Sequence, residues 1–287
     1  MENELDKYEW DTEVAPHAPD LYDFAGIDAG LNGFDAIDDQ AIALYQQQGY
    51  LAIQNAFTPA EMQDAIDGLT DLVAGKRPDF HVIQYRAEVR DQLATMTTAE
   101  KFNHIRKLGT FTEYDARLKA IAQHPRLISL LHRILGAAPH MFQSMALIKP
   151  PRGREKPWHQ DHAYFTLPID APVAGVWIAL EQATAENGCM RVLPGWHKRG
   201  PFTHFQIRDW QLCDDESRVF KNECRAVPLD PGGMLIFDSY LPHGTPANDT
   251  PRGRKALQYH YVAADTPAIT HDERLAVFGP DGRDARC

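Results

Sequence analysis

PWHQDH at residues 157–162 and LPHG at residues 241–244 are the two stretches that decide which fold this chain is expected to adopt. His159 and Asp161 are separated by one residue, and on a β-strand that spacing puts both side chains on one face. Two imidazoles and one carboxylate on one face of an iron ion leave the opposite face open, as in non-haem Fe(II) oxygenases. With His243 as the third ligand, the pattern predicts a strand-borne iron site.

The sequence around these stretches is rich in short β-type runs. Turn-forming residues separate the runs, for example Pro150-Pro151 and Pro231-Gly232-Gly233. Many short strands at such spacing are typical of a sandwich or barrel. The runs are Met141–Ile148, Ala174–Leu180, Cys189–Leu193, Arg225–Leu229, Met234–Phe237 and Ala256–Val262.

The preceding third of the chain is helical in pattern. Thr58, Pro59 and Glu61 form a helix start with a capping box, and the helix is expected to run to about Ala74. Helices are also predicted over 38–48 and 115–135, a short strand over 49–53, and helix and loop over 76–110. The expected fold is mainly β with α: a β-barrel (141–265) supported by N-terminal helices (38–140), in one domain spanning 38–287.

The acidity of the chain is confined to its N-terminus. Residues 1–40 hold 12 Asp/Glu and one Lys, while the remainder holds 28 residues of each sign. The body is therefore near neutral, and no nucleic-acid-binding surface is predicted. The acidic arm, residues 1–37, carries Tyr8, Trp10, Tyr22, Phe24 and Phe34, so it is either a solvated extension or a segment that packs along the body or a partner subunit.

Compartment and redox state are inferred from simple features. No run of 18 apolar residues is present, and Met1-Glu2-Asn3-Glu4 is polar, unlike a signal peptide. We therefore expect a cytoplasmic protein without a membrane partner. The four cysteines form no CxxC pair and are expected to be free thiols. The oligomeric state is left open.

Arg254 follows His243 by 11 residues and suggests a cosubstrate. 2-Oxoglutarate can chelate Fe(II) through its 1-carboxylate and keto oxygen, and its distal carboxylate then needs a cation. An arginine fork binds a carboxylate in a bidentate manner, and the Thr245 hydroxyl could donate to the same group. The alternative is a surface arginine in the cluster with Arg252 and Lys255.

The combined motifs resemble the phytanoyl-CoA dioxygenase family over roughly residues 40–265. The similar segments are Lys149-Pro150-Pro151, His159–Phe165, Trp177–Leu180, Glu186–Cys189, Leu193–Lys198, Pro231–Gly233, His243-Gly244 and Arg254–Ala256. The resemblance implies a double-stranded β-helix (jelly-roll, cupin-like) fold. It also implies iron ligands and a cosubstrate pocket. The implied residues are His159, Asp161 and His243 for iron, and Arg254, Trp177, Met145 and Lys107 for 2-oxoglutarate.

Some of these pocket positions have simpler interpretations. Trp177 and Met145 could be barrel core, and Lys107 could be a solvated charge. Strand alternation puts Gln143 on the same face as Met145, so Gln143 is a further candidate for the cosubstrate pocket.

The resemblance implies Fe(II), 2-oxoglutarate and O₂ as cofactor and cosubstrates, with succinate and CO₂ released as a substrate C–H bond is oxidised. Related halogenases replace the ligand carboxylate with a small residue, so Asp161 favours hydroxylation. Three alternatives stay open: an acyl-CoA 2-hydroxylase of the phytanoyl-CoA type, a cupin-like metal enzyme that does not use 2-oxoglutarate, and a non-catalytic barrel.

The substrate pocket is expected beside the open face of the iron. Candidate contacts are His162, Tyr164 and Phe165 after the metal motif, and residues of the 80–110 segment such as Gln84, Tyr85 and Arg86. The long insertion 199–220 could form a lid, and its aromatic residues would suit an apolar or cationic substrate or serve only in packing. Because the body is near neutral, a small metabolite or natural-product intermediate is favoured over a CoA-sized polyanion.

Overall fold

Two β-sheets form the centre of the molecule. The structure is a computed structural model that describes residues 4–287; Met1, Glu2 and Asn3, which begin the polar N-terminus, lie outside the described residues. The larger sheet has the order β1 (Glu9–Asp11), β5 (Ile83–Arg86), β6 (Ile105–Gly109), β7 (Pro139–Lys149), β16 (Arg254–Ala263), β9 (Val173–Ala179), β14 (Met234–Asp238), β4 (Tyr50–Gln54) and β3 (Leu31–Asn32).

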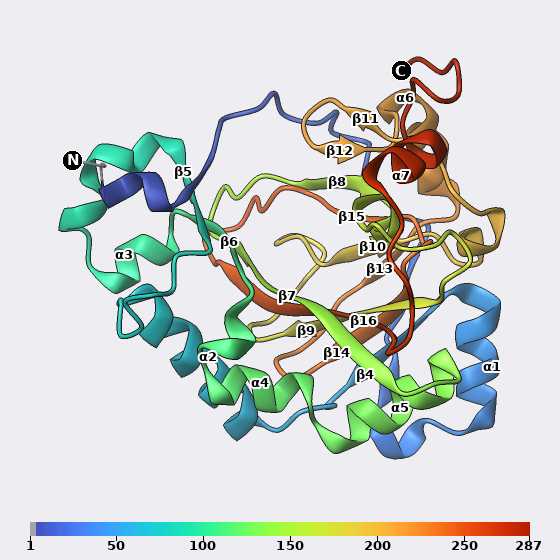
Figure 1. Cartoon of the computed structure of the whole chain (residues 1–287), viewed down its shortest axis with the longest axis horizontal. Helices are drawn as coiled ribbons and strands as arrows, with labels where there is room; N and C mark the ends of the chain where they lie inside the picture. Colours follow the sequence, from blue (N-terminus) through green and yellow to red (C-terminus); the bar gives the residue numbers. More distant parts are fainter. Residues whose placement is uncertain (1–3) are drawn as a thin grey trace.

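The smaller sheet has the order β2 (Gly26–Ile27), β13 (Arg225–Val227), β10 (Met190–Val192), β15 (His243–Thr245) and β8 (Lys156–His159). Figure 1 shows β8, β15, β10 and β13 of the smaller sheet above β7, β9, β16 and β14 of the larger one. A separate two-stranded hairpin consists of β11 (Phe205–Gln206) and β12 (Trp210–Gln211). From β7 to β16 the chain crosses repeatedly between the sheets: β7, β9, β14 and β16 join the larger one, and β8, β10, β13 and β15 the smaller. This is the double-stranded β-helix predicted from the sequence.

The period-two alternation of side chains sorts residues between two cores. On β9, Val176 and Ile178 belong to the core beneath the helices, whereas Trp177 belongs to the core between the sheets. On β16, Leu257 and Tyr259 likewise face the helices. The intervening residues of β16 therefore face the barrel interior, where the candidate site lies.

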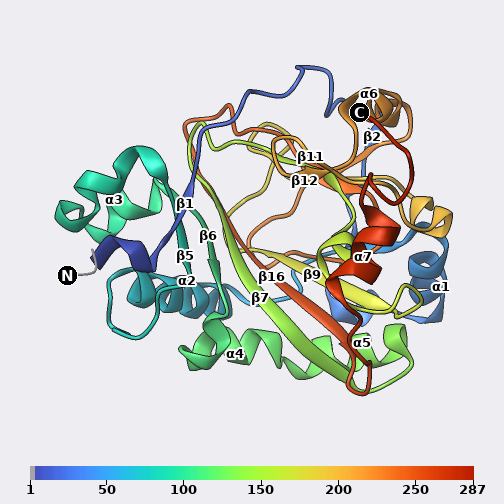
Figure 2. The ribbon, with the colours of Figure 1, turned by 45° about the horizontal axis from the view of Figure 1, so that its top comes forward.

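Helices cover the outer face of the larger sheet. Figure 2 shows α4 and α5 on the side of β7 and β16 that faces away from the smaller sheet. The capping box predicted at Thr58 is present, and Gly136 ends α5 in a left-handed conformation. The helices are α1 (Asp39–Gln48), α2 (Pro59–Val73), α3 (Thr98–Phe102), α4 (Ala116–Ala122), α5 (Pro125–Leu135), α6 (Asp214–Ser217) and α7 (His271–Phe278).

Two expected segments differ from the structure. The single helix predicted over 115–135 is two helices, because Pro125 lacks an amide hydrogen and begins α5 instead of continuing α4. The segment 76–110, predicted as helix and loop, also contains strands β5 and β6. These strands extend the larger sheet beyond β7.

The N-terminal arm packs along the body. Its strands β1, β2 and β3 pair with β5, β13 and β4 respectively. Leu21 and Tyr22 are buried against the outer side of the smaller sheet. Figure 2 shows the arm, in dark blue, passing β5 and β6 before it crosses the top of the molecule. Of the two alternatives for the arm, the structure has the packed one.

The prediction of four free thiols is wrong for one pair. Cys213 and Cys287 form a disulfide, because the C-terminal tail folds back beside the 199–220 insertion and brings the two Cα atoms to 5.3 Å. Cys189 and Cys224 are free and buried. None of the helices in the described part of the chain combines the length and apolar content that crossing a bilayer requires.

Candidate active site

His159 and His243 are brought together by strand register. They are directly opposite each other on the neighbouring antiparallel strands β8 and β15, and their ring centroids lie 4.2 Å apart. β8 ends at His159, so Asp161 is not on the strand itself as expected. Gln160 is nevertheless extended (φ −109°, ψ 129°), which keeps Asp161 on the same side as His159.

The three side chains form a buried metal-binding geometry. Their ligand atoms all lie within 4.8 Å of one another. Asp161 Oδ1 is 3.1 Å from His159 Nε2 and 3.6 Å from His243 Nε2. The Nδ1 atoms of the two histidines donate to the backbone carbonyls of Pro157 (2.7 Å) and Leu241 (2.9 Å), which leaves both Nε2 lone pairs for a metal.

Protonation states also suit a metal. Burial, together with the neighbouring His159, lowers the pKa of His243 to about 3, so its imidazole is neutral. Burial alone would raise the pKa of Asp161, but the surrounding imidazoles and the hydrogen bond from His260 outweigh it and hold that pKa well below its usual value. Two imidazoles and a carboxylate are the donor set that Fe(II) accepts, and the residues fit this metal.

The second carboxylate oxygen of Asp161 is held from behind. Oδ2 accepts hydrogen bonds from His260 Nε2 at 2.7 Å and Gln258 Nε2 at 3.1 Å. Both residues lie on β16 and are buried. Sequence reasoning missed them, although counting every second residue from Arg254 along a strand would have placed both on its inward face.

A cavity of about 380 Å³ lies beside the triad. Most of the site residues predicted from the sequence line this cavity. Those that line it are His159, Asp161, His243, Arg254, Trp177, Met145, Lys107, Thr245, Gln143, Tyr164 and Phe165.

Arg254 forms one end of this cavity. Its side chain is buried, and Nη2 donates to the Gly188 carbonyl at 2.7 Å. Its Nε and the nearby Trp177 Nε1 are buried without a hydrogen-bond partner, which marks this end as built for a polar ligand. The guanidinium carbon lies 5.0 Å from the Trp177 ring centroid.

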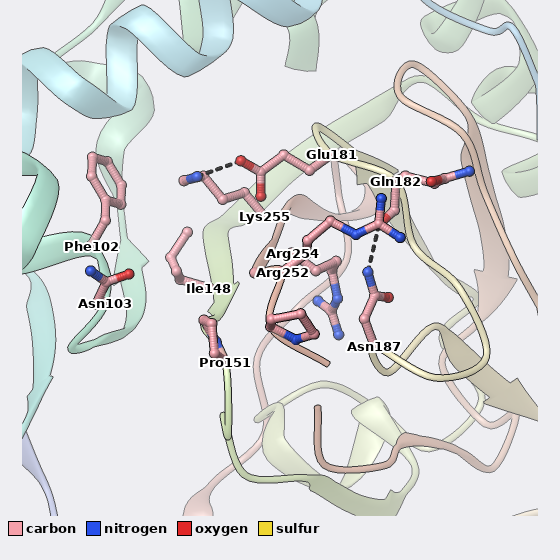
Figure 3. A pocket seen from close by; sticks show the side chains of 12 residues that line it. Phe102, Asn103, Ile148, Pro151, Glu181, Gln182, Asn187, Arg252, Arg254 and Lys255 are labelled. Carbon is pink, nitrogen blue, oxygen red and sulfur yellow. Dashed lines mark hydrogen bonds and ion pairs between the residues drawn. The ribbon is translucent and has the colours of Figure 1, made fainter. Parts of the chain in front are cut away.

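The alternative interpretation of Arg254, a surface arginine, describes its neighbours Arg252 and Lys255 and not Arg254 itself. Figure 3 shows a second pocket, lined by Arg252 and Lys255 among others. Its volume is about 430 Å³, and the Lys255 ammonium pairs with Glu181 at 2.5 Å. Arg254 lines both this outer pocket and the inner cavity, whereas Arg252 and Lys255 line only the outer one. Within this cluster, Arg254 therefore reaches the inner cavity, whereas Arg252 and Lys255 do not.

Thr245 is oriented by a lysine that sequence reasoning did not nominate. Lys149 Nζ donates to Thr245 Oγ1 at 2.7 Å and to the Pro246 carbonyl. Because the hydroxyl oxygen accepts from Lys149, its hydrogen is free to donate into the cavity. Burial and the positive charge of Arg254 hold the pKa of Lys149 well below its usual value.

Two expected substrate contacts must be corrected. His162 is fully buried, and its ring nitrogens bond to Ser239 Oγ (2.9 Å) and the Pro168 carbonyl (3.0 Å), because the helical turn after Asp161 directs the ring away from the cavity. Tyr85 packs in the helix-side core against Tyr8, since it occupies the face of β5 opposite to Gln84. Neither lines the cavity, whereas Gln84 does.

The insertion 199–220 contributes to the wall of the cavity through polar residues. Gln206, Arg208 and Asp209 line the cavity. Its aromatic residues pack instead: His204 is fully buried and stacks on Trp210. The insertion therefore gives no support to the expectation of an apolar or cationic substrate.

Comparisons with known proteins agree with this site and fold. The family model for phytanoyl-CoA dioxygenase (PhyH) matches residues 45–256. A zebrafish (Danio rerio) relative, "phytanoyl-CoA dioxygenase domain-containing protein 1", is 23% identical over 80% of this chain and 92% of its own. The human "phytanoyl-CoA dioxygenase, peroxisomal" is 26% identical over 77% of this chain and 67% of its own.

Solved structures show the same fold. The alpha ketoglutarate dependent carbocyclase SnoK from nogalamycin biosynthesis matches with a TM-score of 0.66 at 18% identity, over 86% of this chain and 93% of its own. EctD from S. alaskensis, solved with 2-oxoglutarate and 5-hydroxyectoine, matches with a TM-score of 0.65 at 22% identity, over 93% and 86% respectively. With the family model covering most of the barrel and its helices, the chain belongs to the phytanoyl-CoA dioxygenase family.

Proposed function

We propose that this protein is an Fe(II)- and 2-oxoglutarate-dependent dioxygenase that hydroxylates an unactivated C–H bond of a small metabolite or natural-product intermediate. One oxygen atom enters the substrate, and 2-oxoglutarate leaves as succinate and CO₂. The observation that carries the proposal is that the buried triad and the unpartnered guanidinium nitrogen of Arg254 share one cavity.

Each part of the cavity has a distinct task in this proposal. His159, Asp161 and His243 would hold Fe(II), which when bound supplies open sites for the cosubstrate and O₂. Arg254 and the Thr245 hydroxyl receive the distal carboxylate of 2-oxoglutarate. Trp177 and Met145 form the wall beside it, and the burial of the three metal-binding side chains limits the access of water to them. Lys107 lies at the rim, paired with Glu9 at 3.3 Å.

Small substrates are supported by the size of the cavity. About 380 Å³ is near the lower end for ligand pockets, and the cosubstrate takes part of it. A relative from Gimesia maris, 24% identical over 79% of this chain, is named methylphosphonate hydroxylase. The acyl-CoA 2-hydroxylase alternative rests on the name of the human relative. In a metal enzyme that does not use 2-oxoglutarate, the buried Arg254 would have no carboxylate ligand to bind.

The first experiment tests iron and cosubstrate binding directly. Anaerobic addition of Fe(II) and 2-oxoglutarate should produce a weak visible charge-transfer band. Arg254→Gln should weaken 2-oxoglutarate binding at least about 10-fold, because a charge-assisted bidentate contact is lost. Arg252→Gln removes the same charge from the outer pocket and should leave binding unchanged. A protein that binds Fe(II) but gives no band would contradict the proposal.

We also propose a cytoplasmic location and a small-molecule substrate rather than a nucleic acid or membrane partner. The buried free thiols Cys189 and Cys224 fit a reducing compartment, whereas the Cys213–Cys287 disulfide is a bond that such a compartment rarely holds. Cell fractionation tests the location: the protein should be recovered together with cytoplasmic marker enzymes. Recovery with membranes or in the medium would contradict it.

A further inference from the structure

Besides Arg254 and Lys149, the lining of the cavity carries further positively charged side chains. Two carboxylates, Asp161 at the metal site and Asp209, accompany five such cationic side chains. The five are Arg106, Lys107, Arg154, Lys156 and Arg208. The near-zero net charge of the body does not predict this concentration of positive charge, because the residues come from separate parts of the chain.

Most of these cations are already neutralised by a partner. Lys156 Nζ is 2.9 Å from Asp209, and Arg208 pairs with Glu155 and Asp214 at 2.5 Å each. Arg106 donates to the backbone carbonyls of residues 154 and 155. These groups therefore offer few free hydrogen-bond donors to a ligand.

Arg154 differs from the others. Its Nε and Nη2 form a fork on Asp11 of the N-terminal arm, at 3.0 and 2.7 Å. Its Nη1 is buried and has no partner. Because a buried donor without an acceptor is unfavourable in a native protein, this atom calls for an anionic or carbonyl ligand atom in the cavity.

Gln143 presents the complementary group. Its side-chain Oε1 is a buried acceptor without a partner, and the residue lines the same cavity. On the sheet, Gln143 is in register with His260, which bonds to Asp161. An unsatisfied acceptor on β7 therefore lies close to the metal site, while an unsatisfied cationic donor comes from the connection between β7 and β8, which lines the same cavity.

We infer that the substrate is a small hydrophilic anion, with a carboxylate, phosphate or phosphonate group bound by Arg154 and a hydroxyl or amino group that donates to Gln143. The inference rests on the proposed function, since it names the substrate class of the same site. The cavity volume limits the substrate to a molecule that fits beside 2-oxoglutarate. The carbon to be hydroxylated then lies close to the hydroxyl or amino group, on the metal side of the anionic group.

Binding of matched probe pairs tests this class. The Fe(II)-loaded protein is kept anaerobic and saturated with N-oxalylglycine, which fills the Arg254 end so that probes cannot bind there. Glycerol 3-phosphate is compared with glycerol, and 3-hydroxybutyrate with 3-hydroxybutyramide, by calorimetry. At least one anion should bind about 10-fold or more tightly than its neutral partner. If neither anion binds more tightly than its neutral partner, the inference is wrong.

Two variants separate ligand binding from docking of the arm. Arg154→Gln should abolish the preference for anions. Asp11→Asn breaks the same ion pair but keeps the guanidinium, so the preference should persist or increase. Arg252→Gln, which removes a charge only from the outer pocket in Figure 3, should have no effect. Equal losses in Arg154→Gln and Asp11→Asn would assign the effect to the arm and overturn the inference.

A spectrum of the same preparation keeps the two proposals apart. The Fe(II)–2-oxoglutarate charge-transfer band is recorded before N-oxalylglycine is used. A normal band without anion preference contradicts the substrate class alone. Anion preference without the band contradicts the proposed dioxygenase function and leaves the binding site supported.

Discussion

The two oxygens of Asp161 face different surroundings. Oδ1 lies beside the two ligand histidines, whereas Oδ2 accepts from His260 and Gln258. With Oδ2 occupied by two donors, the carboxylate presents a single oxygen to a metal. His260 also packs against the Phe165 ring at a centroid distance of 4.8 Å, which fixes its orientation. His260 is thus a positioning residue for the metal ligand.

Replacing His260 should weaken metal binding more than it weakens the fold. In His260→Phe the Asp161 carboxylate loses its shortest hydrogen bond, and we expect Fe(II) affinity to fall by about 10- to 100-fold in anaerobic titrations. Tyr261→Phe is the matched control, because that side chain points to the helices and donates to the Ala122 carbonyl. An unchanged Fe(II) affinity in His260→Phe would refute the positioning role.

At the residue scale, the sequence identified side chains that belong to local motifs. His159 and Asp161 share one short stretch, and His243 precedes Arg254 by a recognisable step. Lys149 and Arg154 were not identified, because their roles depend on contacts with Thr245 and with the distant Asp11. Such contacts between remote segments follow from tertiary structure and leave no local pattern.

At the element scale, the start of α4 depends on Asp115. Its carboxylate accepts from the backbone amides of Arg117 (2.9 Å) and Leu118 (3.2 Å) and pairs with the Arg117 side chain, which also bonds to Asp71 on α2. This cap joins the two helices that support the larger sheet at its β6–β7 end. Its loss should therefore destabilise the protein.

Asp115→Ala should lower the free energy of unfolding by about 1–2 kcal/mol at neutral pH, as measured by urea denaturation. Asp64→Ala, which removes an exposed carboxylate from α2, is the control and should change stability by less than about 0.5 kcal/mol. A loss in Asp115→Ala no larger than that of the control would show that the cap contributes little.

The effect of Asp115 should also depend on pH. Burial would raise its pKa, but the hydrogen bonds from Arg117 and Leu118 outweigh burial and lower it. A carboxyl with a lowered folded-state pKa stabilises above its unfolded pKa, near 4, and loses that contribution as pH falls through the folded value. The difference between wild type and Asp115→Ala should therefore shrink below about pH 4, and a constant difference down to pH 2 would exclude this linkage.

Helix boundaries were well predicted where capping chemistry is local. The Thr58–Glu61 box and Gly136 are examples. Pro125 is itself a helix-start signal, but the apolar spacing continues on either side of it and favours a single helix over 115–135. Strands β5 and β6 were missed because they are short and charged, and they are strands by virtue of pairing with each other and with β7.

At the scale of the whole molecule, the arm joins parts that are distant in sequence. The Tyr22 ring stacks on Trp158 of β8 at 5.7 Å, and its hydroxyl donates to Glu155, which also pairs with Arg208 of the insertion. Arm, smaller sheet and insertion meet at this point. The aromatic content of the arm hinted at packing, but the sequence could not indicate which surface it would cover.

Tyr22→Ala should lower the free energy of unfolding by about 3–5 kcal/mol, as for other buried aromatic residues, in urea denaturation followed by fluorescence. Phe24→Ala removes a neighbouring but exposed ring and should cost less than about 1 kcal/mol. Similar small losses in both variants would show that the arm adds little to stability.

The crossing of the chain between the two sheets has a consequence for how the protein folds. His159 and His243 become neighbours only when β8 pairs with β15, and four intervening core strands must first be threaded alternately into the two sheets. Topologies dominated by such non-local pairs fold slowly, since loop-closure entropy is lost before the contacts form. The metal site is therefore completed late, so iron would stabilise the finished barrel against unfolding without helping the chain to reach it.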